Sequence, residues 1–119
     1  MSTFRDLLIW QKSMTLVTEI YLLTNSFPKE EIYGLTSQIR RCSISIPSNI
    51  AEGFGRNGNQ DYLKFLSFSI ASLFEMQTQI EIAFNLNYIT QQQFNTIYNE
   101  TKELERMTSS FIRKIKERI

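Results

Sequence analysis

Apolar residues recur every three or four positions along four stretches of this chain, and this spacing places them on one face of a helix in each stretch. Breaker residues separate the stretches, foremost the glycines and asparagines between Gly53 and Asn59. The predicted helices cover about residues 4–24, 29–56, 60–86 and 91–117. Short connections favour antiparallel neighbours. The pattern therefore predicts an all-α fold, an antiparallel up-down-up-down four-helix bundle that takes residues 1–119 as one domain.

Each predicted helix has a core stripe. The stripes of the first two helices are Leu7, Trp10, Met14, Val17 and Tyr21, then Ile32, Leu35, Ile39, Cys42, Ile46 and Ile50. Those of the last two are Tyr62, Leu66, Ser69, Leu73, Met76, Ile80 and Phe84, then Phe94, Ile97, Thr101, Leu104, Thr108, Phe111 and Ile115. Thr3 with Asp6 and Thr90 with Gln93 have the spacing of capping boxes, so we expect helices to begin there.

Residues 43–53 concentrate small and polar side chains where a bundle helix would normally carry large apolar ones. Pro47 removes a backbone hydrogen bond, so we expect the second helix to be kinked there. The structural interpretation of this segment is close helix packing, with Glu52 paired to Arg56 one turn later. The functional interpretation is a recognition surface. The motif that we single out consists of Pro47, Asn49, Glu52 and Gly53.

A second apolar stripe runs along the third predicted helix, through Phe65, Phe68, Ser72 and Ile82. A helix that is apolar on two faces needs a second surface to cover it. We therefore expect the chain to self-associate, with Phe65, Phe68 and Ser72 in the oligomer interface. Burial within the bundle is the alternative.

Composition argues against several function classes. The chain has no histidine, which removes the commonest general base and the commonest transition-metal ligand. Its single cysteine, Cys42, cannot form an internal disulfide, and its first residues show no signal-peptide pattern, so a cytoplasmic location is expected. Neither a phosphate-binding loop nor a metal-ligand cluster is recognisable, and no apolar run is long enough for a membrane helix. We expect no catalytic residue, no cofactor, no metal and no membrane contact.

Two groups of basic residues are candidate nucleic-acid contacts, although the formal net charge is only +1. Arg40 and Arg41 follow the core residue Ile39 and should point outward; with Arg56 and Lys64 they could form one basic patch that binds phosphates. A solvated face or an intersubunit ion pair is the alternative. The second group lies near the C-terminus, where basic charge also compensates the helix dipole: Arg113, Lys114 and Lys116.

Several segments together carry a family pattern. The most distinctive is Ser45-Ile46-Pro47-Ser48-Asn49-Ile50-Ala51-Glu52-Gly53-Phe54-Gly55-Arg56, and the others are residues 8–14, 27–31, 33–41, 66–78 and 87–89. In these segments the chain resembles the 23S rRNA-intervening sequence proteins, also called S23 ribosomal protein-like or four-helix bundle proteins. One departure is Ala71, which stands where the family usually has a glycine and adds a methyl group where helices or subunits approach closely.

The resemblance implies a four-helix bundle assembled as a ring-like homopentamer. Members of this family are encoded in intervening sequences of large-subunit ribosomal RNA genes or elsewhere in bacterial genomes. One relative accompanies a diversity-generating retroelement, where it binds nucleic acid and a reverse transcriptase. The second stripe of the third helix would be covered in such a ring.

Two hypotheses follow for the function. The first is a non-enzymatic oligomeric adaptor that binds RNA or DNA through basic rows repeated around the ring, led by Arg40, Arg41 and Arg56. The alternative is a protein-interaction scaffold that holds another protein, for example a nucleic-acid enzyme, without touching nucleic acid. An enzyme is a distant third hypothesis, which would need an activity that depends on Glu52 or Glu75.

Overall fold

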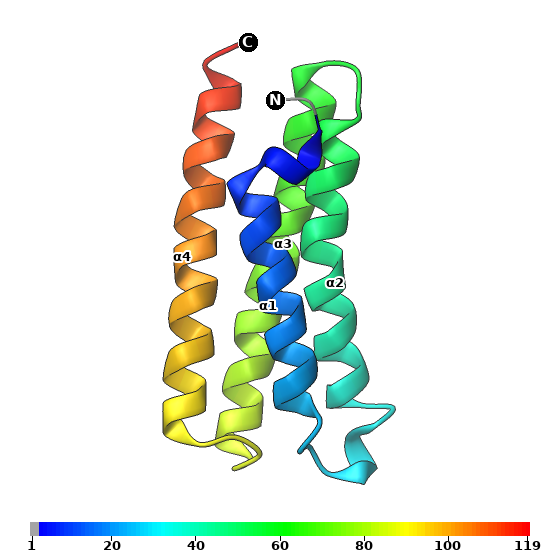
Figure 1. Ribbon diagram of the computed structural model, residues 1–119, viewed down its shortest axis with the longest axis vertical. Coiled ribbons are helices and arrows are strands. Elements are labelled where there is room, and N and C mark those ends of the chain that lie inside the picture. Colours follow the sequence, from blue (N-terminus) through cyan, green and yellow to red (C-terminus); the bar gives the residue numbers. More distant parts are fainter. Residues whose placement is uncertain (1–2) are drawn as a thin grey trace.

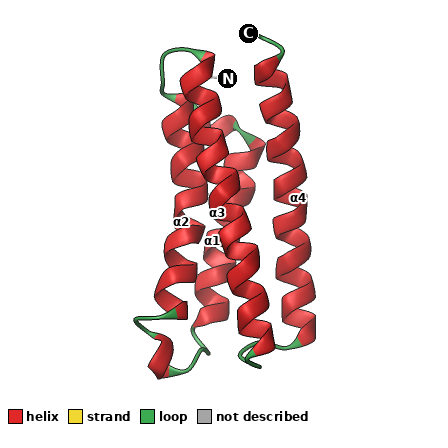
Figure 2. Cartoon of the chain, turned by 180° about the vertical axis from the view of Figure 1, so that it is seen from behind, coloured by secondary structure: helices red, strands yellow, loops and turns green. Residues whose placement is uncertain are grey.

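The computed structural model describes residues 3–119, and within that range the chain forms four long helices and no strand. They are α1 (Leu8–Thr24), α2 (Leu35–Phe54), α3 (Asn59–Asn85) and α4 (Gln91–Lys116). The helices lie side by side and alternate in direction, in a body of 46 × 24 × 20 Å (Figure 1 and Figure 2). The predicted four-helix bundle is confirmed. Residues 1 and 2 of the predicted domain lie outside the described residues. None of the helices in residues 3–119 is both long and apolar enough to cross a membrane.

The first two helices start later than predicted. A 3-10 turn, η1 (Phe4–Asp6), precedes α1, and the capping box of Thr3 and Asp6 caps this turn rather than α1. Leu7 is extended, with φ −75° and ψ 124°, and separates the two. A second 3-10 turn, η2 (Lys29–Glu31), precedes α2. The predicted start of the second helix at residue 29 is therefore wrong.

The interruption before α2 has a local cause at Gly34. Its backbone, with φ −114° and ψ −115°, is not helical, and it directly precedes the first residue of α2. The carboxylate of Glu31 accepts a hydrogen bond from the backbone N–H of Leu35 at 3.0 Å and so satisfies one orphan donor of the new helix. Ile32, predicted for the core, lies in this turn and is 58% exposed.

The core stripes of α2, α3 and α4 are confirmed at most positions. In α3 and α4 every residue of the predicted stripes is buried except Phe84, Phe94 and Phe111, which are half-buried against the core. The capping box of Thr90 and Gln93 starts α4 as predicted. The buried residues of the four helices thus form one hydrophobic core.

Of the core stripe predicted for the first helix, Leu7 is buried, but within α1 the stripe is wrong by about one position along the helix. Met14 and Tyr21 are exposed, and Trp10 and Val17 are only half-buried. The residues of α1 that face the core are Ile9, Ser13, Leu16, Ile20 and Thr24. The hydroxyl groups of Ser13 and Thr24 donate to backbone carbonyls of α1, at 2.8 Å each. Both hydroxyls are therefore hydrogen-bonded although they are buried.

Candidate nucleic-acid interface

Ser45 and Gly53 of this segment contact α3, and α2 and α3 form the most extensive contact between helices of the bundle. A methyl group on Gly53 would lie 2.9 Å from Phe65 Cβ and 3.0 Å from Tyr62 Cδ1, so this close approach requires glycine. Pro47 is buried inside a helix that continues through it, and the kink expected there stays a prediction.

A short polar network crosses the same seam. Asn49 Nδ2 donates to the carbonyl and the hydroxyl of Ser45, at 2.8 and 2.9 Å, and Ser72 Oγ donates to Ser45 Oγ at 2.9 Å. Glu52 is exposed, and the ion pairs formed by the described residues do not include one between Glu52 and Arg56, so that predicted pair is wrong. These contacts favour the structural interpretation of the motif.

Arg40 does not point into solvent as predicted, but ties α2 to the C-terminal end of α1. Its Nε donates to Thr24 Oγ1 at 2.8 Å. Its Nη2 donates to the carbonyl of Tyr21 at 3.3 Å and to Asn25 Oδ1 at 3.1 Å. The guanidinium also lies 4.6 Å from the centroid of the Tyr21 ring. Its donors are thus committed to the end of a helix, where unpaired carbonyls need partners.

The predicted patch of Arg40, Arg41, Arg56 and Lys64 is not one patch. Arg40 and Arg56 are separated by almost all of α2, about 24 Å at 1.5 Å per residue. Arg41 is exposed and lies in a shallow hollow with Arg40 on the outer α1–α2 surface. Arg56 lies at the other end of the bundle, 4.6 Å above the ring of Phe65.

A groove between α3 and α4 collects three of the predicted basic residues. Lys64 from α3 and Arg113 and Lys116 from α4 line a cavity of about 610 Å³. Arg113 and Lys116 are three positions apart and therefore share a helix face. The rest of the lining is apolar or uncharged: Gln60, Leu63, Ser67, Ile70, Ser109 and Ile112. Lys64 of the first predicted group thus meets Arg113 and Lys116 of the second.

Lys114 faces the opposite side of α4, towards α1. It lines a cavity of about 590 Å³ together with Arg106 and Arg118, two basic residues that the sequence analysis missed. The apolar part of this lining is Leu7, Leu8, Ile9, Met107 and Phe111. The spacing of Arg106, Lys114 and Arg118, at multiples of four, was a signal that could have placed them on one face.

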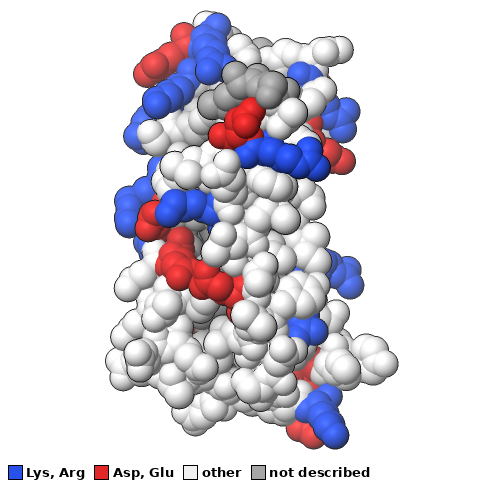
Figure 3. All heavy atoms as spheres, in the orientation of Figure 1, with Lys and Arg blue, Asp and Glu red and all other residues white. Residues whose placement is uncertain are grey.

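Charge is segregated along α4. Residues 106–118 hold five basic residues and one acidic residue, whereas residues 91–105 hold one basic residue and three acidic ones. Figure 3 shows Lys and Arg side chains gathered over the C-terminal end of α4, Asp and Glu side chains in a band about halfway down, and a largely uncharged surface below that band. Although the net charge is only +1, the C-terminal end of α4 is therefore locally basic.

The acidic band lies on the seam between α1 and α4. Glu19, Glu100 and Glu103 line a cavity of about 280 Å³ with Lys12, and Lys12 Nζ lies 2.9 Å from Glu103 Oε1. Burial raises the pKa of Glu100 to about 7, helped by its hydrogen bond to Glu19 and by the charges of Glu19 and Glu103. Lys12 lowers the pKa of Glu103. In residues 3–119 no group of three or more Cys, Asp or Glu residues could hold a metal ion.

The predicted oligomer residues Phe65, Phe68 and Ser72 divide between two environments. Ser72 serves the α2–α3 seam through its hydrogen bond to Ser45. The rings of Phe65 and Phe68 meet edge to face at 5.7 Å, and Phe68 is 43% exposed. An apolar surface thus continues onto the outer face of α3, and self-association through it stays a prediction.

The groups with intrinsic reactivity are engaged inside the chain. Cys42 is buried, its Sγ lies 3.2 Å from Gln79 Oε1, and burial raises the pKa of its thiol to about 12. Glu75 Oε2 accepts a hydrogen bond from Gln79 at 3.0 Å. The arrangement holds a neutral thiol away from solvent and offers no activated nucleophile at this position.

The chain is similar to known proteins in sequence and in fold. The family model described as 23S rRNA-intervening sequence protein matches residues 5–110. A crystal structure of a protein with unknown function from the S23 ribosomal protein family of Bacteroides thetaiotaomicron superposes with a TM-score of 0.81 at 24% sequence identity. The match covers 88% of this chain and 95% of that chain, and it concerns the fold. No curated protein matches the chain significantly.

Proposed function

The chain belongs to the 23S rRNA-intervening sequence protein family, and we propose that it is a non-enzymatic, oligomeric adaptor that binds RNA or DNA. The observation that carries this proposal is the α3–α4 groove, where Lys64, Arg113 and Lys116 lie together. Lysine and arginine neutralise phosphates and release condensed counterions, which supplies most of sequence-independent affinity for nucleic acid. The uncharged part of the lining offers surface for sugars and bases beside the phosphates.

An oligomer would make this modest charge effective. Each chain carries a net charge of only +1, but a ring repeats the groove on every subunit, and linked contacts raise avidity without new interactions. The homopentamer implied by the family resemblance is the assembly that we propose, with the exposed Phe68 in its interface. A cytoplasmic location fits the single buried thiol.

The experiment that tests the proposal combines light scattering on a size-exclusion peak with fluorescence anisotropy of labelled 20-nucleotide RNA and DNA in a salt titration. We expect a pentamer whose affinity falls with salt, with a log–log slope of about −2 to −3 for each subunit that engages three phosphates. The double variant Lys64→Glu/Arg113→Glu should bind at least tenfold more weakly and have a shallower slope.

A matched control separates the groove from bulk charge. The double variant Lys29→Glu/Arg41→Glu makes the same change in net charge at two exposed positions outside the groove, so it should retain most of the affinity. An equal loss in both double variants would mean that charge alone matters. Loss in the control only would return the site to the surface around Arg41, and an oligomer that binds neither RNA nor DNA would overturn the proposal.

The second candidate is a protein-interaction scaffold, and exposed apolar residues favour it. Phe68 and Ile82 on α3, and Leu86 directly after it, are each more than 40% exposed. A nucleic-acid enzyme is the partner that we expect on this reading. A protein partner that stays bound after nuclease treatment, together with a pentamer that is inert towards nucleic acid, would support it.

A further inference from the structure

The seam between α1 and α4 holds a row of hollows and is bridged by the ion pair of Lys12 and Glu103. Three cavities follow one another there, of about 590, 280 and 590 Å³. Figure 1 shows the two helices side by side on the front of the bundle, and Figure 3 shows the same face with its charges. Glu19 lines both the middle and the lower cavity, so these two are adjacent. We call this row of hollows the α1–α4 groove.

The walls of the α1–α4 groove have the spacing of a coiled-coil surface. Steps of three and four residues on α1 give the lining positions Leu8, Lys12, Thr15, Glu19 and Leu22. The same steps on α4 give Gln93, Thr96, Glu100, Glu103, Met107, Ser110 and Lys114. These steps keep the lining positions in line over several turns of both helices, so the row of hollows runs parallel to the helix axes. A straight, rod-shaped occupant such as an α-helix fits along it.

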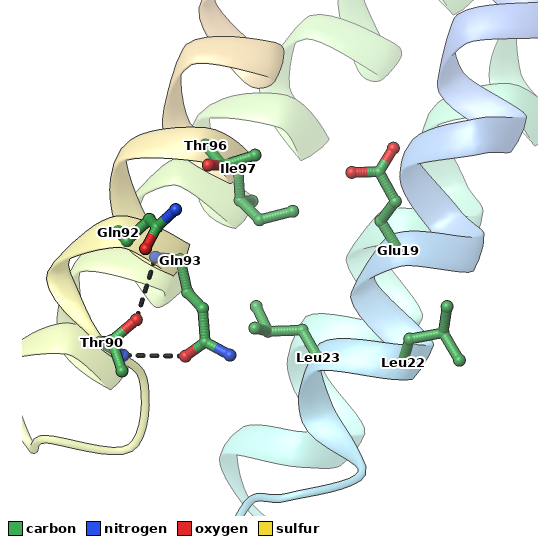
Figure 4. Close-up of a pocket in the computed structure, with 8 residues that line it drawn as sticks. All are labelled: Glu19, Leu22, Leu23, Thr90, Gln92, Gln93, Thr96 and Ile97. Carbon is green, nitrogen blue, oxygen red and sulfur yellow. Dashed lines mark hydrogen bonds between the residues drawn. The ribbon is translucent and has the colours of Figure 1, made fainter.

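Both ends of the groove offer apolar anchor points. At the lower end, Leu23 points from α1 towards Gln93 of α4, and Leu22, which also lines this cavity, points away from α4 (Figure 4). Leu22 is 67% exposed. At the upper end Leu8 is 57% exposed. The distance from Leu8 to Leu22 is about 21 Å along the helix, so an occupant that reaches both anchors needs about 14 residues.

The charges of the groove specify the occupant further. Its middle holds Glu19, Glu100 and Glu103 with Lys12 as the cation, and Lys12 is already paired with Glu103. Glu19 and Glu100 are hydrogen-bonded to each other, and Lys12 is the one cation among the residues that line this cavity. A lysine or arginine from a partner would supply the missing charge at this point. The upper end is basic and would favour acidic residues on the same partner.

We propose that the α1–α4 groove docks an amphipathic α-helix of a partner protein, which places apolar side chains at both ends of the groove and a lysine or arginine against Glu19 and Glu100. This surface is distinct from the α3–α4 groove proposed for nucleic acid, because the two lie on opposite sides of α4. The adaptor would thus hold a protein on one side and nucleic acid on the other.

A docked cation would change the protonation of Glu100. Burial and the hydrogen bond to Glu19 raise the pKa of Glu100 to about 7, so near neutral pH a proton is shared at this point. The facing groups that titrate or carry charge are Glu19 and Lys12 on α1 and Glu103 on α4. A partner's cation favours the ionised carboxylate. Docking should therefore release a proton, whereas purely apolar docking should not.

Two synthetic peptides of 18 residues test the proposal with the full-length protein. Both are helical, with leucines at heptad positions in the first and last turns; one has lysine at the centre and the other glutamate. We expect the lysine peptide to bind at least tenfold more tightly by fluorescence anisotropy. Its calorimetric heat at pH 7 should vary with the ionisation enthalpy of the buffer, as proton release requires.

Variants of the protein locate the site. Glu19→Gln/Glu100→Gln should abolish the preference for lysine and the proton release, and Leu22→Asp should weaken both peptides. The control Glu30→Gln/Glu81→Gln removes the same charge at exposed positions outside the groove and should change neither result. Equal binding of the two peptides, or a preference that survives Glu19→Gln/Glu100→Gln, would overturn the proposal. Dissociation of the oligomer by Leu22→Asp would instead identify a second copy of this chain as the occupant.

Discussion

Replacement of Glu100 by glutamine should stabilise the protein at alkaline pH. In the native state burial, aided by the hydrogen bond to Glu19, raises the pKa of Glu100 from 4.5 to about 7. Because the folded pKa lies above the unfolded one, the native protein holds this proton more tightly than the unfolded chain does. The stabilisation from this group is fully present below pH 4.5 and is lost as the pH rises through 7.

The size of the effect follows from the shift. A rise from 4.5 to about 7 corresponds to at most about 3.4 kcal/mol, at about 1.36 kcal/mol per pKa unit. Glu100 is only half-buried, and solvent screening reduces this to about 1–2 kcal/mol. Glutamine keeps the shape of the side chain, cannot ionise, and can donate its amide hydrogen to Glu19 as the protonated carboxyl does. Glu100→Gln and the parent should therefore be equally stable near pH 4.5 and differ by about 1–2 kcal/mol at pH 8.

Urea unfolding followed by circular dichroism measures this difference at pH 4.5, 6, 7 and 8, at one protein concentration. Carboxylates that do not interact with Glu100 contribute equally in both proteins, so their contributions cancel. The control Glu103→Gln has the opposite sign: Lys12 lowers the pKa of Glu103, and its removal should destabilise the protein at pH 8. If Glu100→Gln is not more stable than the parent at pH 8, or if the difference does not vary with pH, the two carboxylates do not share a proton.

Three further predictions concern the core and its seams. Gly53→Ala should destabilise the protein by about 1 kcal/mol or more in urea, because the clash with Phe65 Cβ at 2.9 Å cannot be relieved by a side-chain rotation and outweighs the gain in helix propensity. Arg40→Met should cost about 1–2 kcal/mol through its lost hydrogen bonds to the end of α1, whereas Arg41→Met at an exposed position should change stability by less than about 0.5 kcal/mol. Cys42 should react with a thiol reagent at the rate of unfolding, and a fast reaction in native buffer would contradict its burial.

The existence of the four helices and the buried faces of three of them could be predicted from the sequence, because their apolar spacing coincides with the core. The face of α1 could not. Periodicity scored on apolar residues passes over Ser13 and Thr24, which are buried because each hydroxyl finds a carbonyl within its own helix. Apolar periodicity selects Met14 and Tyr21 instead, which are 43% and 37% exposed.

The interruptions before α1 and α2 could not be predicted either, since they depend on backbone conformation. Leucine has a high helix propensity, yet Leu7 is extended and separates η1 from α1. The apolar spacing runs through Gly34 without a break, whereas its non-helical backbone and the cap provided by Glu31 show that a new helix begins after it.

The basic residues of the candidate site could be predicted from the sequence, but their arrangement in space could not. Lys64, Arg113 and Lys116 were singled out from local charge, but their meeting depends on α3 and α4 being neighbours, which pattern alone does not say. Arg40 illustrates the reverse problem, because its position beside a core residue suggested exposure while the end of α1 supplied three acceptors for its guanidinium. A basic residue is free to bind a phosphate only if the fold leaves its donors unused.

The segregation of charge along α4 connects the two proposed surfaces. Successive residues of a helix are about 100° apart, so Arg113 and Lys114 leave α4 on different sides although they are adjacent in sequence. One side meets α3 and the other meets α1. Nucleic acid in the α3–α4 groove and a helix in the α1–α4 groove would therefore share α4 as a wall without competing for the same side chains. The two ligands should bind together, and any coupling between them would have to pass through α4 itself.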